Sequence, residues 1–158
     1  MFNGENGLKV AIYVKEFSRK ESELFSDKNQ MRICQEFIKI HKEWIMFKEY
    51  HDEYSKKINL PQLEKLLTDG EERQLDWVIT SEAERFGKDV EAAYQNSKKL
   101  LGLGIGVIFI KDDINTKELI GMMKLGIMSQ MSKSKKQLQS ERIKEGLKKK
   151  RTEVISRN

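Results

Sequence analysis

The sequence predicts an α/β fold, a three-layer sandwich around a mostly parallel sheet with a long C-terminal helix. Short β-prone runs alternate with segments of helical periodicity along residues 9–118. The connections between successive strands are long enough to hold a helix each, which parallel strands require. A last helical segment starts near Thr116 and continues past Leu147, so it is longer than the diameter of a body of this size.

Length and composition exclude several classes of protein. The chain has 158 residues, which favours one domain. Its single cysteine, Cys34, excludes an internal disulfide. No apolar run reaches the ~20 residues of a membrane span, and residues 1–8 lack the apolar core of a secretion signal. We therefore expect a cytoplasmic protein with no membrane contact, whose residues 1–118 form an α/β body and residues 119–158 a long helix and basic tail of the same domain.

Four β-prone runs predict the strands, residues 9–14, 44–47, 77–80 and 105–110. The first helix is expected to start at Asp27, because Gln30 follows three residues later as in a capping box. Its inner face is expected to hold Cys34, Phe37, Ile38 and His41. Residues 52–59 are polar and predict a loop.

Pro61 opens the second predicted helix, and Gly70 is its expected stop. The third helix is indicated by residues that share one mostly apolar face, Val90, Ala93, Tyr94, Ser97 and Leu101. The glycines at 102, 104 and 106 resemble a phosphate-binding loop, but they precede a strand. A phosphate cradle needs the reverse order, strand and then helix N-terminus, so we interpret them as a helix stop.

The last helix is expected to start with Thr116 as its cap and to have two halves. Its first half carries an apolar stripe, Ile120, Met123, Ile127 and Met131. Beyond it the apolar positions thin to Leu138, Ile143 and Leu147, among many lysines. We expect the first half to pack on the sheet or on a partner subunit, and the second half to project and to need a partner chain or DNA.

Charge is unevenly distributed along the chain. Residues 1–125 hold 20 basic and 22 acidic residues, whereas residues 126–158 hold 10 basic and 3 acidic residues. The densest basic run is Lys148, Lys149, Lys150 and Arg151. Such a tail favours a polyanion such as nucleic acid, and a solvated helix face with surplus lysines is the alternative interpretation.

Seven short motifs then follow one another in order along roughly residues 9–150. Residues 11–15 with Ser18 look like a strand and its nucleophile loop, and residues 84–89 read Glu-Arg-Phe-Gly-Lys-Asp. The others are residues 26–30, 49–53 and 61–67, Gly121, and residues 140–146. Together they resemble the catalytic domain of the serine recombinases, the resolvase/invertase family, whose hallmark is Asp-Arg-Leu-(Ser/Gly)-Arg.

This resemblance implies a site-specific recombinase that cleaves and rejoins double-stranded DNA through a 5′-phosphoserine intermediate, without cofactor or metal. It also implies a dimer or tetramer formed through the long helix. The nucleophile is expected to be Ser18. Cations would neutralise the pentavalent transition state, and Arg85, Lys15, Lys88 and Lys136 are the candidates. Tyr13 and Asp52 would position these cations and Glu84 would orient them, while the run from Lys148 to Arg151 would bind DNA.

The chain departs from the family pattern at several positions. The family spacing Tyr-x-Arg-x-Ser gives Tyr13, Lys15 and Phe17 here, so Ser18 comes one residue late. The hallmark aspartate is Glu84 and the second hallmark arginine is Lys88. A catalytically degenerate relative that acts as a DNA-binding or oligomerisation module is therefore the alternative hypothesis, and an α/β domain for a small phosphate ligand is the third.

Overall fold

The computed structural model describes residues 7–16, 26–54 and 59–156. Strands and helices alternate along these ranges, as the sequence predicts. The elements in chain order are β1 (Leu8–Lys15), α1 (Asp27–Lys39), β2 (Trp44–Asp52), α2 (Pro61–Glu71), β3 (Trp77–Thr80), the 3-10 turn η2 (Ala83–Arg85), α3 (Val90–Gly102), β4 (Gly106–Phe109), β5 (Ile114–Asn115) and α4 (Leu119–Ser156).

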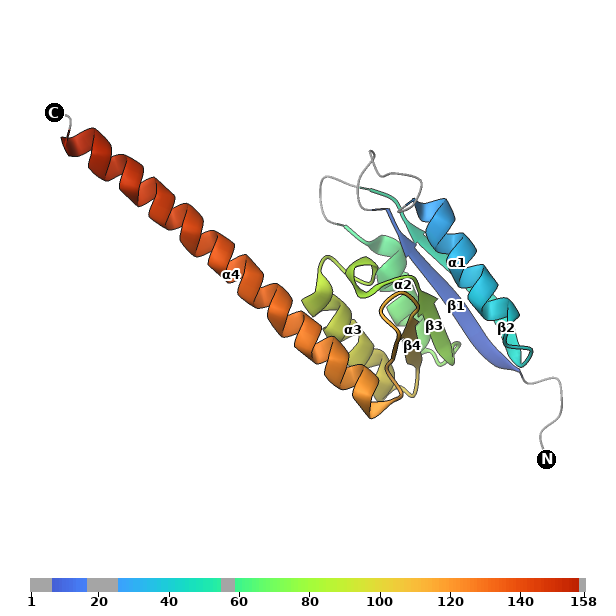
Figure 1. Cartoon of the computed structure of the whole chain (residues 1–158). Helices are drawn as coiled ribbons and strands as arrows, with labels where there is room; N and C mark the ends of the chain where they lie inside the picture. Colours follow the sequence, from blue (N-terminus) through green and yellow to red (C-terminus); the bar gives the residue numbers. More distant parts are fainter. Residues whose placement is uncertain (1–6, 17–25, 55–58, 157–158) are drawn as a thin grey trace.

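The five strands form one sheet in the order β2-β1-β3-β4-β5 (Figure 1). Neighbouring strands run parallel from β2 to β4, and only the short β5 is antiparallel. The mostly parallel sheet confirms the predicted fold class. The carboxyl ends of β1 and β3 consequently meet at one edge of the sheet, which is the usual ligand site of such sheets.

Helices cover both faces of the sheet, because β1 is apolar on both sides. Val10, Ile12 and Val14 point to one face and pack with Cys34 of α1. Ala11 and Tyr13 alternate with them and join the second core, which lies under α2 and α3. Lys15 continues this second alternation, so its side chain leaves β1 on the α3 side.

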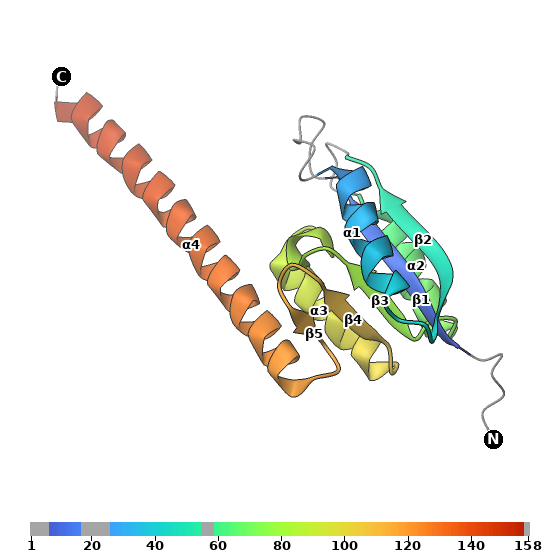
Figure 2. The same cartoon turned by 45° about the vertical axis from the view of Figure 1, so that its right-hand side comes forward.

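The long helix α4 has 38 residues, so it spans about 57 Å. Its first half lies along α3, and its second half extends away from the body (Figures 1 and 2). From residue 133 to residue 153 every side chain is exposed. The predicted projection is therefore present. Among the described residues, no helix combines the length and the apolar character that crossing a membrane requires.

The first helix starts at Asp27 as expected, but three details of the helix ends differ from the structure. The N-cap of α1 is Ser26, whose Oγ accepts from the Asn29 amide at 3.2 Å. Gly70 lies inside α2, which continues to Glu71, and the left-handed residue that follows the helix is Arg73, with φ of 58°. Thr116 precedes α4 and does not cap it, since its hydroxyl accepts from the Val107 amide at 2.8 Å.

Candidate active site

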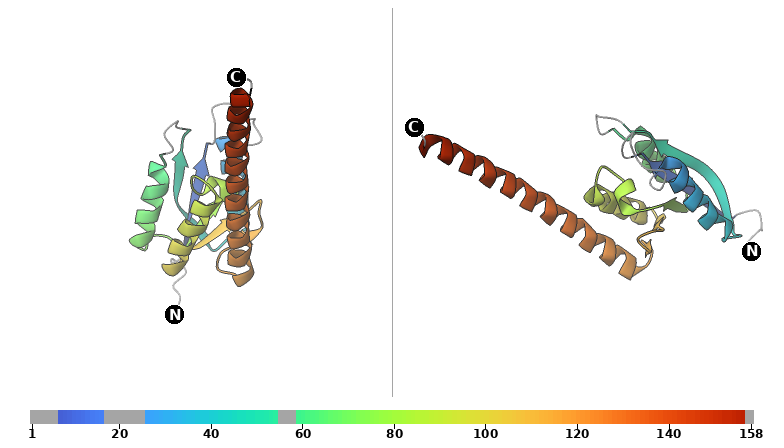
Figure 3. Two further views of the ribbon diagram at one scale, coloured as in Figure 1. Left: turned by 90° about the vertical axis from the view of Figure 1, so that its left-hand side faces the viewer. Right: turned by 45° about the horizontal axis from the view of Figure 1, so that its top comes forward.

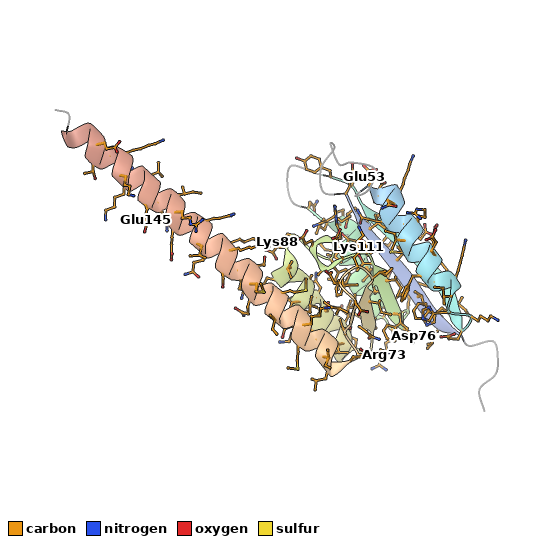
Figure 4. The ribbon with its side chains drawn as sticks, viewed as in Figure 1. Glu53, Arg73, Asp76, Lys88, Lys111 and Glu145 are labelled. Atoms are coloured by element: carbon orange, nitrogen blue, oxygen red, sulfur yellow. The ribbon has the colours of Figure 1, made fainter. Side chains whose placement is uncertain are left out.

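The candidate active site lies at the carboxyl end of β1, where the segment that follows β3 crosses it. β1 ends with Lys15, and η2 ends with Arg85. Lys88 follows in the same segment and lies between the body and α4 in Figure 4. Lys111 comes directly after β4, and its amide bonds to the carbonyl of Ser81, so it shares this edge of the sheet. Four basic residues therefore come from three neighbouring parts of the chain.

Lys15 and Arg85 are brought together, as expected, and both are almost completely buried. Their exposed fractions are 6% and 5%. Nη1 of Arg85 donates to the backbone carbonyl of Lys15 at 3.2 Å. Two buried cations that are close enough for one to lower the pKa of the other are costly unless other groups compensate them. The arrangement is therefore typical of a site that is built to receive negative charge.

The ammonium group of Lys15 is perturbed by this environment. Burial is the main cause that lowers its pKa, to about 8, and the Arg85 guanidinium also lowers it. Nearby carboxylates, of which Asp89 contributes most, act in the opposite direction. Lys15 can consequently lose its proton close to physiological pH, which an exposed lysine does not do.

Gly87 allows the segment that follows β3 to approach Lys15. Its carbonyl accepts a hydrogen bond from Nζ of Lys15. The backbone of Gly87 has φ of 155°, and a Cβ there would lie 2.8 Å from the Cβ of Ala92. Any side chain at this position would push the segment away from α3, and the contact with Lys15 would be lost.

Gln30 belongs to the site, although the sequence analysis did not assign it a role. Its Nε2 donates to the Lys15 carbonyl at 2.9 Å, and its Oε1 accepts from the Lys15 amide at 3.3 Å. The side chain is 1% exposed. Gln30 therefore fixes the end of β1 against α1. Its place in the motif of residues 26–30 was the available signal.

Tyr13 and Asp52 form a buried pair behind Lys15. The Tyr13 hydroxyl donates to Oδ2 of Asp52 at 2.8 Å. The same carboxylate accepts from the amides of Gln62 and Leu63 at 2.9 Å, so it caps the N-terminus of α2. Burial, and then the contact with Asp52, raise the pKa of Tyr13 well above its ordinary value. Both residues thus support the strand that carries Lys15, and their positioning role toward the cations stays a prediction.

The acidic side chains around Arg85 have different surroundings. Glu84 is exposed, and its negative charge raises the pKa of Lys15. The carboxylate that bonds to Arg85 is that of Glu82, with Nε to Oε1 at 3.4 Å. Lys88 is exposed, so it can turn toward an incoming phosphate without leaving a buried position.

Lys136 of α4 lies at the border of the site, against Asp89. Its Nζ is 2.8 Å from Oδ2 of Asp89, whose other carboxylate oxygen caps α3 through the Ala92 amide at 2.8 Å. Although burial alone would raise the pKa of Asp89, the hydrogen bond from Lys136 and the cap lower it overall. Lys133, three residues earlier, pairs with Glu91 at 2.9 Å.

The expected nucleophile, Ser18, lies outside the described residues. Another expected part of the site stands apart from this cluster. The basic run from Lys148 to Arg151 is exposed on the far part of α4, away from the body (Figure 3). Within the described ranges, no three His, Cys, Asp or Glu side chains gather in a way that could hold a metal ion.

Comparisons with known proteins identify one family model that matches most of the chain and several similar solved structures. A family model described as the resolvase N-terminal domain matches residues 11–153. The N-terminal catalytic domain of TP901-1 integrase is similar at 23% identity and a TM-score of 0.66, over 83% of this chain and 98% of that one. A resolvase family site-specific recombinase from Streptococcus pneumoniae is 16% identical with a TM-score of 0.67, over 91% and 99% of the two chains.

A third similar structure is the C-terminal catalytic domain of ISC1926 TnpA, an IS607-like serine recombinase. It is 18% identical with a TM-score of 0.56, over 66% of this chain and 71% of that one. Among curated proteins, no sequence matches the chain significantly.

Proposed function

The chain belongs to the resolvase family and is the catalytic domain of a site-specific DNA recombinase of the serine class, and we propose that Ser18 and the cations around Arg85 form its active centre. In this proposal the Ser18 hydroxyl attacks a phosphodiester. A phosphorus–oxygen bond to the serine forms and the bond to the 3′ oxygen breaks. The reverse attack by a 3′ hydroxyl rejoins the strands, so no external energy source is needed.

The observation that carries the proposal is the buried contact between Lys15 and Arg85. A serine hydroxyl is a weak nucleophile, and the transition state gathers negative charge on the phosphate oxygens. Arg85 presents a planar fork that holds two of these oxygens, and Lys15 adds a second fixed charge. Because the protein already holds both groups in position, little reorganisation is needed when DNA arrives.

Formation of a covalent adduct tests this function directly. The protein is mixed with end-labelled cognate duplex and the products are separated on a denaturing gel. We expect a labelled band that migrates with the protein and disappears after protease treatment. The absence of any such band with cognate DNA would favour the degenerate, non-enzymatic alternative.

The perturbed lysine predicts a pH dependence of cleavage. Lys15 is charged below its pKa of about 8 and neutral above it. If its charge stabilises the transition state, the rate at subsaturating DNA should be constant well below pH 8 and fall above it. The expected fall is about fivefold between pH 8 and pH 9. Single-turnover adduct formation at constant ionic strength measures it.

Lys15→Arg is the matched variant for this prediction, because a guanidinium stays charged over the whole range. Its profile should remain flat where the rate of the unmodified protein declines. Parallel declines in both proteins would assign the pH dependence to another group.

We further propose that the chain assembles as a dimer or tetramer through α4. Ile120, Met123 and Ile127 are exposed by 77%, 58% and 60%. A groove of about 730 Å³ runs beside them between α3 and α4, and Tyr94 of α3 lines it. Apolar side chains exposed together to this extent usually mark an interface between proteins.

Ile127→Glu should separate the subunits, because it introduces a charge into the centre of this stripe. Ile45→Glu on β2 is the control, since Ile45 is also exposed, by 48%, but lies on another element. Light scattering over a range of concentrations should show a lower mass for Ile127→Glu only. Equal masses for both variants would exclude this stripe as the interface.

A further inference from the structure

Two lysines of α4, Lys133 and Lys136, are paired with carboxylates at the first turn of α3. Lys136 contacts Asp89 at 2.8 Å, and Lys133 contacts Glu91 at 2.9 Å. The two lysines are three residues apart and therefore lie on the same side of α4. From Lys133 onward every described side chain up to residue 153 is exposed, so the two lysines stand where the helix leaves the body.

The carboxylates have the chemistry of the ligand that the site is expected to take. Asp89 is only four residues from Arg85, and its charge partly offsets the lowering of the Lys15 pKa. A negative oxygen thus already lies beside the catalytic cations. The Lys136 ammonium, whose side chain is 61% exposed, donates a hydrogen bond of 2.8 Å to this oxygen.

We propose that Lys133 and Lys136 form a DNA-phosphate site that Asp89 and Glu91 occupy in the DNA-free chain, and that phosphates replace the two carboxylates on binding. This inference rests on the proposed function, because it takes DNA as the ligand. It adds Lys133 to the DNA contacts and assigns Asp89 and Glu91 the role of exchangeable internal partners. The exchange also releases α4 from α3 at the point where the helix leaves the body.

The exchange costs little free energy for the two carboxylates and for the two lysines. Asp89 keeps its bond to the Ala92 amide after the lysine departs, and both carboxylates stay next to the positive end of α3. Ion pairs between groups as exposed as Lys133 and Glu91 contribute little to stability. A phosphate has more charge and more acceptor oxygens than a carboxylate, so it competes well for the ammonium group.

Asp89→Asn is the informative variant, because asparagine caps a helix as well as aspartate but has no charge. Glu91→Gln is its partner variant. The control is Glu71→Gln, which removes the same charge from a similar exposed pair, Glu71 and Lys99 at 2.9 Å. Fluorescence anisotropy with a labelled non-specific duplex, at several salt concentrations, measures the affinity of each full-length variant.

Asp89→Asn should bind DNA more tightly, by about threefold to tenfold at low salt. Glu91→Gln should show a smaller gain, and Glu71→Gln no comparable gain. Most of the gain of Asp89→Asn should disappear in a Lys136→Gln background, because the liberated lysine is its cause. Thermal unfolding of Asp89→Asn should change little.

The opposite outcomes are distinct. If Asp89→Asn lowers the melting temperature and leaves DNA affinity unchanged or weaker, the pairs only hold the fold. If its gain persists in the Lys136→Gln background, simple repulsion between Asp89 and DNA explains it. Both results overturn the inference while leaving the proposed function intact. If no variant binds DNA at any salt concentration, the proposed function fails together with it.

Discussion

Replacing Ser18 by alanine is expected to abolish the covalent protein–DNA adduct. No other group can form the phosphoserine bond if Ser18 is the nucleophile, so the loss should be complete rather than partial. Binding of the duplex should be retained, because the cations remain. A denaturing gel and an anisotropy titration on the same preparation separate the two effects.

Ser22→Ala is the matched control, because this serine lies four residues later in the same stretch between β1 and α1. It should form the adduct at the rate of the unmodified protein. If Ser22→Ala loses the adduct and Ser18→Ala keeps it, Ser18 is not the nucleophile. The displacement of Ser18 from the family spacing then means that this chain has lost the family's serine.

Arg85→Ala should reduce adduct formation by about 10²–10³, the usual effect of removing one fixed oxyanion donor. The loss should at least equal that of changing Lys15 or Lys88. Because Arg85 is buried, thermal unfolding must be measured alongside the assay.

The double variant Lys15→Arg with Lys88→Arg should raise the rate of adduct formation if the two lysines limit it, since each arginine restores a planar fork.

Most of the fold follows from patterns that depend on near neighbours in the chain. The run from residue 9 to residue 14 is apolar on both faces, and it forms the strand that both cores share. Boundaries were less accurate where a distant contact decides them. Leu100 and Ile105 lie against Gly70, so packing accounts for the glycine there and it does not mark the helix end. The Thr116 hydroxyl accepts from the Val107 amide instead of capping α4.

The candidate site could be located from motifs, but its internal contacts could not. The hallmark segment identified Arg85, and the first strand identified Lys15. That Glu82 bonds to Arg85 depends on how η2 turns, which no local pattern specifies. The pairing of Asp89 with Lys136 joins residues 47 positions apart, so it appears only once α4 lies against α3.

Removing residues 148–158 is expected to weaken non-specific DNA binding by at least tenfold at low salt. Lys148, Lys149, Lys150 and Arg151 are all exposed on the far part of α4. Each phosphate that they neutralise contributes about 0.9 to the slope of log affinity against log salt. The truncated chain should therefore show both lower affinity and a shallower slope, by a similar amount for any sequence.

Two variants separate charge from helix length in this prediction. Replacing the four basic residues by glutamine in the full chain should reproduce the truncation, because the loss is electrostatic. The same change at four exposed lysines of the body, Lys9, Lys39, Lys42 and Lys65, should have a much smaller effect. If truncation and tail substitution both leave affinity and slope unchanged, the basic run is a solvated face, and phosphate contacts must come from Lys133, Lys136 and the cations around Arg85.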